Sequence, residues 1–178
     1  MSPSLQMQKI MNFTAMSDGQ FILPGRQVPC ALGKGGVRPA SEKREGDGAS
    51  PLGIWPIRRL LYRPDREPRP PTRLPIQALT PSDGWCDAPS DPAYNQQVTL
   101  PYPASAETLW RDDHVYDFIL VLGHNDAPVV PGMGSAIFLH LARPGYLPTE
   151  GCIALARPDL PDLLALAQSG DTVSIVRP

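Results

Sequence analysis

The sequence predicts a mostly β fold of the β-rich α+β class, a β-sandwich or barrel with one helix near its C-terminal end. Proline and glycine number 23 and 15 among 178 residues, a composition that disfavours long helices. Hydrophobic residues still make up 42% of the chain, too many for a disordered linker. Because the apolar runs are of strand length, we expect one β-rich domain over residues 20–178, after a partly flexible N-terminal segment at 1–19.

Turn chemistry indicates the first strands. Two apolar runs in residues 20–32 flank Pro24-Gly25, which is typical of a β-turn because Pro presets one dihedral angle and Gly adopts the positive one. Residues 33–53 are polar and glycine-rich, and we expect a loop there. Residues 54–62 read as the next strand, in which Pro56 indicates an edge position or a bulge.

The middle of the chain carries weak signals. Five prolines among charged residues at 63–75 predict an extended connector. Residues 80–103 are expected to be mostly irregular, and residues 105–110 to form one short helical turn.

The C-terminal part is clearer. Apolar runs at 116–123 and 135–141 predict two strands, separated by a segment rich in Gly and Pro. Leucines at helical spacing predict a helix over residues 159–168, and residues 172–176 predict the last strand.

Charge and cysteine content narrow the functional class. The formal net charge of −2 argues against nucleic-acid binding, and the longest apolar run, residues 118–122, is far too short to span a bilayer. Of the three cysteines, Cys30 and Cys86 are either buried small hydrophobes or disulfide partners, and the sequence leaves both readings open. Because the number of cysteines is odd, at least one has no intramolecular disulfide partner, and we expect Cys152 to be that free thiol.

A histidine and a cysteine carry the strongest chemical signal. His140 lies in an apolar run, where strand alternation directs it to the face opposite Leu139 and Leu141. Cys152 is a weak nucleophile at its ordinary pKa of about 8.5 and needs a base, which an imidazole supplies. Gly151 adds no side chain beside the thiol, so that backbone N–H groups can face an oxyanion. These three residues form the candidate catalytic group.

Two other interpretations compete for these residues. A single strand histidine is more often a core residue than a base, and an isolated Gly-Cys pair is common. A metal site is the second rival, but no pair of candidate ligands has a familiar spacing such as H-x-x-x-H or C-x-x-C. The candidates for it are His114, His124, Asp126, His140 and Cys152. We expect neither a metal nor another cofactor.

Several motifs resemble the L,D-transpeptidase family, whose catalytic domains are also called YkuD-type. Residues 137–140, Ile-Phe-Leu-His, and 149–153, Thr-Glu-Gly-Cys-Ile, are similar to its pattern of a His, a spacer and Ser/Thr-x-Gly-Cys. Residues 43–53, Lys-Arg-Glu-Gly-Asp-Gly-Ala-Ser-Pro-Leu-Gly, resemble its Thr-Pro-x-Gly segment, with Ser50 in place of Thr. The resemblance covers most of the chain, from residue 20 to residue 176.

The resemblance implies an L,D-transpeptidase-like fold and a two-step acyl transfer on peptidoglycan stem peptides. Cys152 would attack a donor carbonyl to form a thioester, and an amine of an acceptor stem would resolve it into a cross-link. His140 would be the base, and the N–H of Cys152, with another near Gly151, would form the oxyanion hole. A monomer in the periplasm or cell envelope is expected, although residues 1–13 show no export-signal pattern.

Departures from the family pattern keep two alternatives open. The spacing from His to Cys is shorter than usual, Leu141 stands where Gly often follows the His, and Ala154 stands where Arg or Asn is typical. One alternative is a hydrolase of the same fold, an L,D-carboxypeptidase or amidase. The other is a non-catalytic peptidoglycan-binding module, and the absence of the usual Arg or Asn at position 154 favours it.

Six residues are candidates for substrate binding. Two follow a strand end, where an Asx-type turn explains them equally well, and most of the others lie on or beside the loop between base and nucleophile. They are His124, Asp126, Arg143, Tyr146, Thr149 and Arg157.

Overall fold

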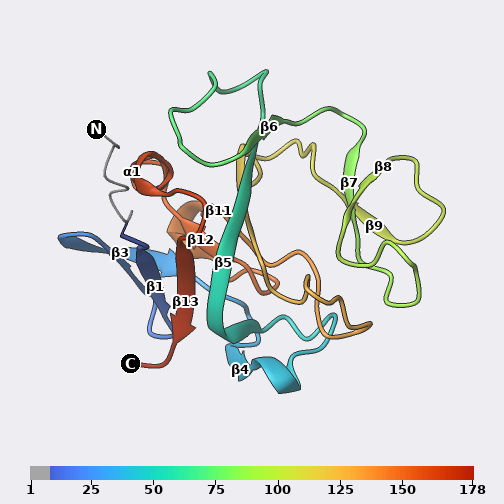
Figure 1. Ribbon diagram of the computed structural model, residues 1–178, viewed down its shortest axis with the longest axis horizontal. Coiled ribbons are helices and arrows are strands. Elements are labelled where there is room, and N and C mark those ends of the chain that lie inside the picture. The colour runs from blue at the N-terminus through green and yellow to red at the C-terminus, as the bar shows by residue number, and fades with distance from the viewer. Residues whose placement is uncertain (1–8) are drawn as a thin grey trace, which may run out of the picture.

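The computed structural model describes residues 9–178, which form a β-barrel, one α-helix packed against it and a small three-stranded sheet set to one side (Figure 1). The predicted mostly β fold with a single helix is confirmed over these residues. The barrel strands are β1 (Asn12–Met16), β2 (Gln20–Leu23), β3 (Arg26–Ala31), β5 (Ser50–Tyr62), β10 (Phe118–Leu122), β11 (Phe138–Leu141), β12 (Ile153–Leu155) and β13 (Thr172–Val176). Two short strands pair along β5, namely β4 (Val37–Pro39) and β6 (Ile76–Ala78).

The long strand β5 closes the barrel. Its first part pairs with β13 and its second part with β10, so that the order β10-β11-β12-β3-β2-β1-β13-β5 returns to β10. The register with β10 shifts between Val121 and Leu122, which face Arg59 and Ile57. This irregularity lies beside Pro56 and is the bulge that the proline predicts.

The barrel interior is the main hydrophobic core. Inward residues alternate along the strands, as Phe13 and Ala15 do on β1. The helix α1 (Leu160–Leu166) adds Leu160, Leu163 and Leu164, all fully buried, at the helical spacing that the sequence shows. No helix in residues 9–178 has the length and hydropathy needed to cross a membrane.

Residues 33–53 are more ordered than a loop. They contain β4, the 3-10 turn η1 (Ala40–Glu42) and the start of β5. Val37 pairs with Ser50 in a parallel ladder. Because main-chain hydrogen bonds hold this ladder and most of its side chains are polar, the sequence shows no hydrophobic alternation that would predict a strand. The expected loop is therefore wrong over these strand residues.

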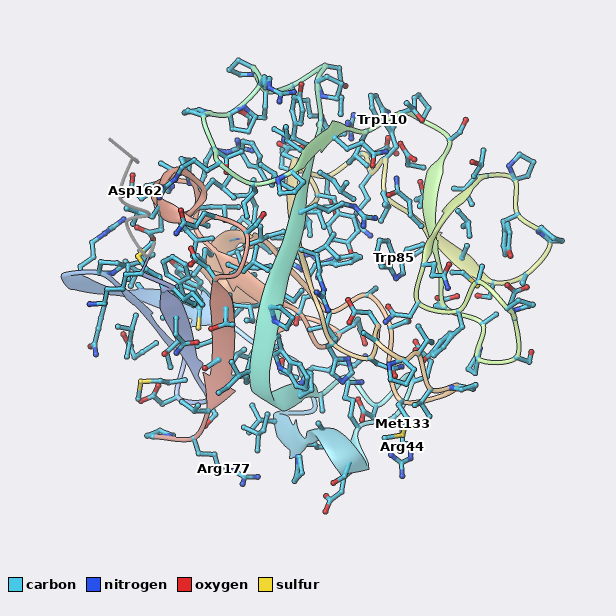
Figure 2. The ribbon with its side chains drawn as sticks, in the orientation of Figure 1. Arg44, Trp85, Trp110, Met133, Asp162 and Arg177 are labelled. Carbon is cyan, nitrogen blue, oxygen red and sulfur yellow. The ribbon has the colours of Figure 1, made fainter. Side chains whose placement is uncertain are left out.

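The expected irregular segment and helical turn are also replaced by strands. Strands β7 (Asp83–Cys86), β8 (Gln97–Thr99) and β9 (Ala106–Thr108) form the small sheet, with Trp85 opposite both Gln97 and Glu107. Strands of three or four residues are too short to show alternation. Trp85 packs edge-on against Phe138 of β11, with ring centroids 4.9 Å apart, and so joins the small sheet to the barrel. Figure 2 shows Trp85 on the side of the small sheet that faces the barrel.

Part of the N-terminal segment belongs to the barrel. Residues 1–8 lie outside the described residues, so the flexibility expected there is not addressed, but β1 pairs with both β2 and β13. Asp171, fully buried, accepts hydrogen bonds from the N–H groups of Met11 at 2.8 Å and Gln168 at 2.9 Å. This carboxylate ties the start of β1 to the end of the helix, ahead of the expected boundary at residue 20.

Replacing Asp171 by Ala should lower the free energy of unfolding by about 2–4 kcal/mol, because two N–H groups lose their acceptor. Urea unfolding followed by tryptophan fluorescence measures the change. Asp162→Ala is the matched control, since its side chain is 62% exposed and pairs with Arg26, and its loss should stay below about 1 kcal/mol. Equal losses in the two variants would contradict the role given to Asp171.

Candidate active site

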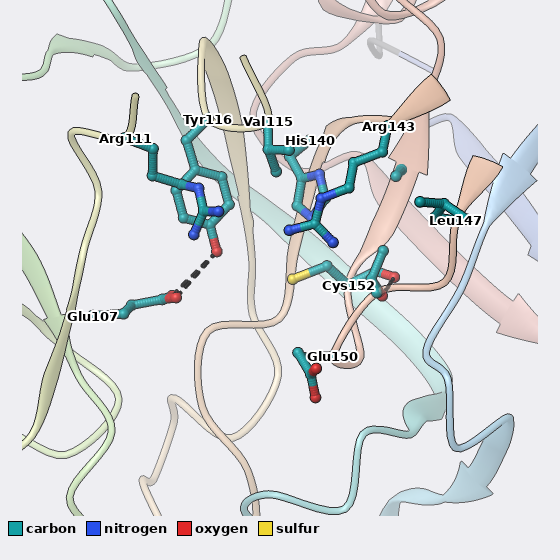
Figure 3. A pocket seen from close by; sticks show the side chains of 11 residues that line it. Glu107, Arg111, Val115, Tyr116, His140, Arg143, Leu147, Glu150 and Cys152 are labelled. Carbon is teal, nitrogen blue, oxygen red and sulfur yellow. Dashed lines mark hydrogen bonds between the residues drawn. The ribbon is translucent and has the colours of Figure 1, made fainter. Parts of the chain in front are cut away.

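Parallel pairing of β11 with β12 brings the histidine and the cysteine to one cavity. His140 is paired with Ala154 in the ladder, and Cys152 directly precedes β12, two residues before Ala154 and therefore on the same face. All three residues line a cavity of about 110 Å³, together with Glu107, Tyr116 and Arg143 (Figure 3). The small side chain of Ala154 thus forms part of the wall beside His140.

A close approach of two backbones determines the turn before the cysteine. Gly151 has φ +138°, and a Cβ atom there would lie 2.8 Å from the carbonyl oxygen of Ala49. Ser50, fully buried, donates from Oγ to the Gly151 carbonyl at 2.8 Å and accepts from the Gly33 N–H at 2.9 Å. The Ser-Pro-x-Gly segment therefore holds the turn before Cys152 in place.

Thr149 completes this turn. Its hydroxyl accepts a hydrogen bond from the Gly151 N–H at 3.1 Å and donates one to the Cys152 carbonyl at 2.7 Å. The hydroxyl expected to bind substrate is thus engaged within the turn. The Gly151 amide is engaged as well, which leaves the Cys152 amide as the candidate oxyanion donor at this position.

Burial keeps the thiol of Cys152 neutral at rest. The side chain donates from Sγ to the Ala136 carbonyl at 3.1 Å and receives the Phe138 N–H at 3.4 Å. Burial raises the pKa of Cys152 to about 12, and the N–H of Phe138 opposes this rise because it stabilises the thiolate. Figure 3 shows the sulfur pointing into the cavity.

His140 is a neutral imidazole with one nitrogen already engaged. Its Nδ1 lies 2.9 Å from the Leu141 carbonyl, and this bond places the ring proton on Nδ1 and leaves Nε2 as a proton acceptor. Burial lowers the pKa of His140 to about 4. The site therefore combines an uncharged thiol with an uncharged base.

The cavity lining also includes residues that were not among the sequence candidates, and Glu107, Arg111 and Tyr116 form a group of contacts beside His140. The ring of Tyr116 lies edge-on to His140, with centroids 5.4 Å apart, and its hydroxyl donates to Glu107 at 3.2 Å (Figure 3). The guanidinium of Arg111 lies 5.4 Å from the centre of the Tyr116 ring. Burial raises the pKa of Glu107 to about 7. Glu107 lies in the predicted helical turn and Tyr116 begins a predicted strand, but neither prediction carries a motif that signals a role at the site.

Arg143 and Thr149 line the cavity, but the other expected binding residues lie elsewhere. Arg157 bonds Asp117 at 2.6 Å and also pairs with Glu67, so its guanidinium is occupied in an ion cluster. Tyr146 lies in the 3-10 turn η2 (Pro144–Tyr146) and is not part of the cavity lining.

His124 and Asp126 are also not among the residues that line the cavity of the thiol. The His124 ring is buried and packs edge-on against Trp55, with centroids 4.8 Å apart. Asp126 forms a two-pronged ion pair with Arg58 and lines a separate cavity near Trp85. Both residues were chosen because they follow a strand end, and that position alone does not show which face of the sheet a side chain lies on.

The described residues also bear on the metal and disulfide interpretations. Within residues 9–178, no three His, Cys, Asp or Glu side chains lie close enough to hold a metal ion. Cys30 and Cys86 belong to different sheets, and both are free thiols.

Comparison with known proteins defines the family. The family model of the L,D-transpeptidase (YkuD) catalytic domain matches residues 5–175. The crystal structure of L,D-transpeptidase 1 from Mycobacterium tuberculosis is similar at 14% identity and a TM-score of 0.43, over 93% of this chain and 58% of that chain. A search of curated proteins finds no match. Because the family match spans nearly the whole chain, the protein belongs to the L,D-transpeptidase catalytic domain family.

Proposed function

We propose that this protein is a cysteine acyltransferase that cross-links peptidoglycan stem peptides through a thioester on Cys152. The observation that carries the proposal is the shared cavity of Cys152 and His140, in which the histidine keeps Nε2 available because Nδ1 is bonded to Leu141. A thiol and a pre-oriented neutral base are what acyl transfer requires. Family membership supports stem peptides as the substrate class, and the cell envelope as the place of action follows from that substrate.

The first half-reaction transfers the acyl group to sulfur. Nε2 of His140 takes the thiol proton while Sγ of Cys152 attacks the donor carbonyl, and the Cys152 N–H faces the developing oxyanion. The tetrahedral intermediate collapses when the C–N bond breaks, and His140 returns the proton to the leaving amine. The Phe138 N–H assists because it stabilises negative charge on the sulfur.

The second half-reaction moves the acyl group to the acceptor. The lone pair of the acceptor amine forms the new C–N bond, and the C–S bond breaks. A proton from the amine passes through His140 to the departing sulfur, which restores the thiol and the neutral imidazole. Water in place of the amine gives the hydrolase alternative, which uses the same residues.

Replacing Cys152 by Ala should abolish new cross-links, because no thioester can form without the sulfur. The measurement is mass spectrometry of muramidase digests after incubation with purified peptidoglycan. Wild-type protein should yield dimeric stem peptides, and fragmentation identifies the donor residue. Shortened monomers without dimers would replace the transferase by the hydrolase. Identical digests from both proteins would overturn the thiol mechanism and leave a binding module.

The pH dependence of thioester formation should follow His140. The base works only when neutral, and burial lowers its pKa to about 4, so the acylation rate should fall as the pH drops through 4 and stay level from pH 5 to 7. Quenched reactions analysed by intact-protein mass give the rate, and fluorescence checks that the fold persists at the lowest pH. A fall centred near pH 6.5, the ordinary histidine value, would contradict the buried neutral base.

A further inference from the structure

A second cavity meets the first one at Cys152. It has a volume of about 250 Å³, and both Cys152 and Glu107 line the two cavities. In the first cavity the guanidinium groups of Arg111 and Arg143 balance the carboxylates of Glu107 and Glu150. The second cavity is mainly acidic, because its lining has one basic side chain, Lys43, and the carboxylates of Glu45, Asp87, Glu107 and Glu150. The thiol thus lies between two spaces of different charge.

Two charged groups of the second cavity, Lys43 and Glu45, are already satisfied within the protein. Lys43 donates to Asp47 at 2.7 Å and to the Arg44 carbonyl at 2.8 Å. Glu45 accepts from the Tyr94 hydroxyl at 2.5 Å and from the Ser135 hydroxyl at 2.8 Å. These groups hold the loop before β5 in place and leave little capacity for a ligand.

Asp87 and Glu107 are different. The Oδ1 atom of Asp87 is buried and has no hydrogen-bond partner among the described residues, and no basic side chain pairs with either carboxylate there. Glu107 accepts from the Tyr116 hydroxyl. A buried carboxylate oxygen without a donor is costly, and such an atom in a folded protein commonly marks the place where a partner binds.

The small sheet places these two carboxylates together. Cys86 of β7 pairs with Ala106 of β9, and the Asp87 N–H donates to the Ser105 carbonyl at 3.1 Å, so that Asp87 and Glu107 leave neighbouring strands. Burial raises the pKa of Glu107, and the nearby charge of Asp87 adds to the rise, while Arg111 opposes it. A bound cation would relieve both effects.

We propose that Asp87 and Glu107 bind the primary ammonium group of the acceptor stem peptide and hold it beside the thioester on Cys152. This assignment rests on the proposed transferase function. The acceptor is chosen over the donor because a donor stem ends in a carboxylate, which suits the guanidinium of Arg143 in the first cavity, while Arg111 there is paired with Asp113.

The carboxylate also fits the proton balance of the second half-reaction. An ammonium group must lose one proton before its nitrogen can attack, and Glu107 accepts that proton and later releases it to solvent. The neutral amine then forms the C–N bond, the C–S bond breaks, and the second amine proton reaches the sulfur through His140. With a pKa raised to about 7, Glu107 is a better acceptor for this proton than an ordinary carboxylate.

The first test measures binding of the acceptor to the second cavity in a protein that cannot form the thioester. The probe is a stem peptide with one free side-chain amine, titrated calorimetrically into the Cys152→Ala protein. Adding Glu107→Gln or Asp87→Asn should weaken binding about tenfold or more, the effect of losing a hydrogen bond to a charged group. The same peptide with an acetylated amine should bind equally weakly to all variants. Equal affinity of the free-amine peptide for all variants would overturn the proposal.

The second test measures how the thioester divides between transfer to the amine and hydrolysis. With Cys152 present, Asp87→Asn changes a residue that lines the second cavity and not the first, and its ratio of dimer to hydrolysed product should fall about tenfold. Glu42→Gln is the matched control, because Glu42 is exposed and lines neither cavity, and its ratio should not change. Slower acylation with an unchanged ratio would assign the carboxylates to the donor and overturn the proposal. Amine-dependent binding without any thioester would instead retain the cleft and reject the transferase.

Discussion

The candidate site depends on the contact between the backbone at Ala49 and Ser50 and the turn that carries Cys152. The Ala49 carbonyl comes so near that position 151 has no room for a side chain, and the Ser50 hydroxyl bonds the Gly151 carbonyl. Ser50 is also the first residue of β5, the strand that closes the barrel. The closure of the fold and the placement of the nucleophile are therefore parts of one constraint, because β5 cannot shift without moving the turn.

Burial at this site has opposite effects on the two groups of the proposed mechanism. It raises the pKa of Cys152 and lowers that of His140, so both changes favour uncharged forms. A resting thiolate and imidazolium pair is thereby disfavoured, and the proton must move as the carbonyl carbon is attacked. The Nδ1 bond to the Leu141 carbonyl makes this possible, since it aligns the ring before substrate arrives.

Sequence patterns predicted the barrel far better than the small sheet. Most barrel strands and α1 have apolar runs or helical spacing over enough residues to be recognised, and the last strand, Thr172–Val176, has the expected bounds, whereas β1 and the three-residue β12 were not predicted. The strands β7, β8 and β9 have three or four residues each, and their existence depends on pairing between distant segments.

The same limit applies to the site. His140, Gly151 and Cys152 form a local motif, whereas Glu107 and Tyr116 reach the cavity through tertiary structure, and Arg157 and Asp126 were sequence candidates that other ion pairs occupy.

The two parts of the fold supply different chemistry. The barrel carries the candidate nucleophile and base on β11 and at the start of β12, where ladders on both sides restrict their movement. The small sheet carries Asp87 and Glu107, and its attachment includes the packing of Trp85 on Phe138. Phe138 is also the residue whose N–H reaches the sulfur of Cys152. The ring that anchors the small sheet and the amide that bonds the sulfur thus belong to one residue, so the group that we propose binds at the small sheet would be positioned relative to the Cys152 sulfur through Phe138.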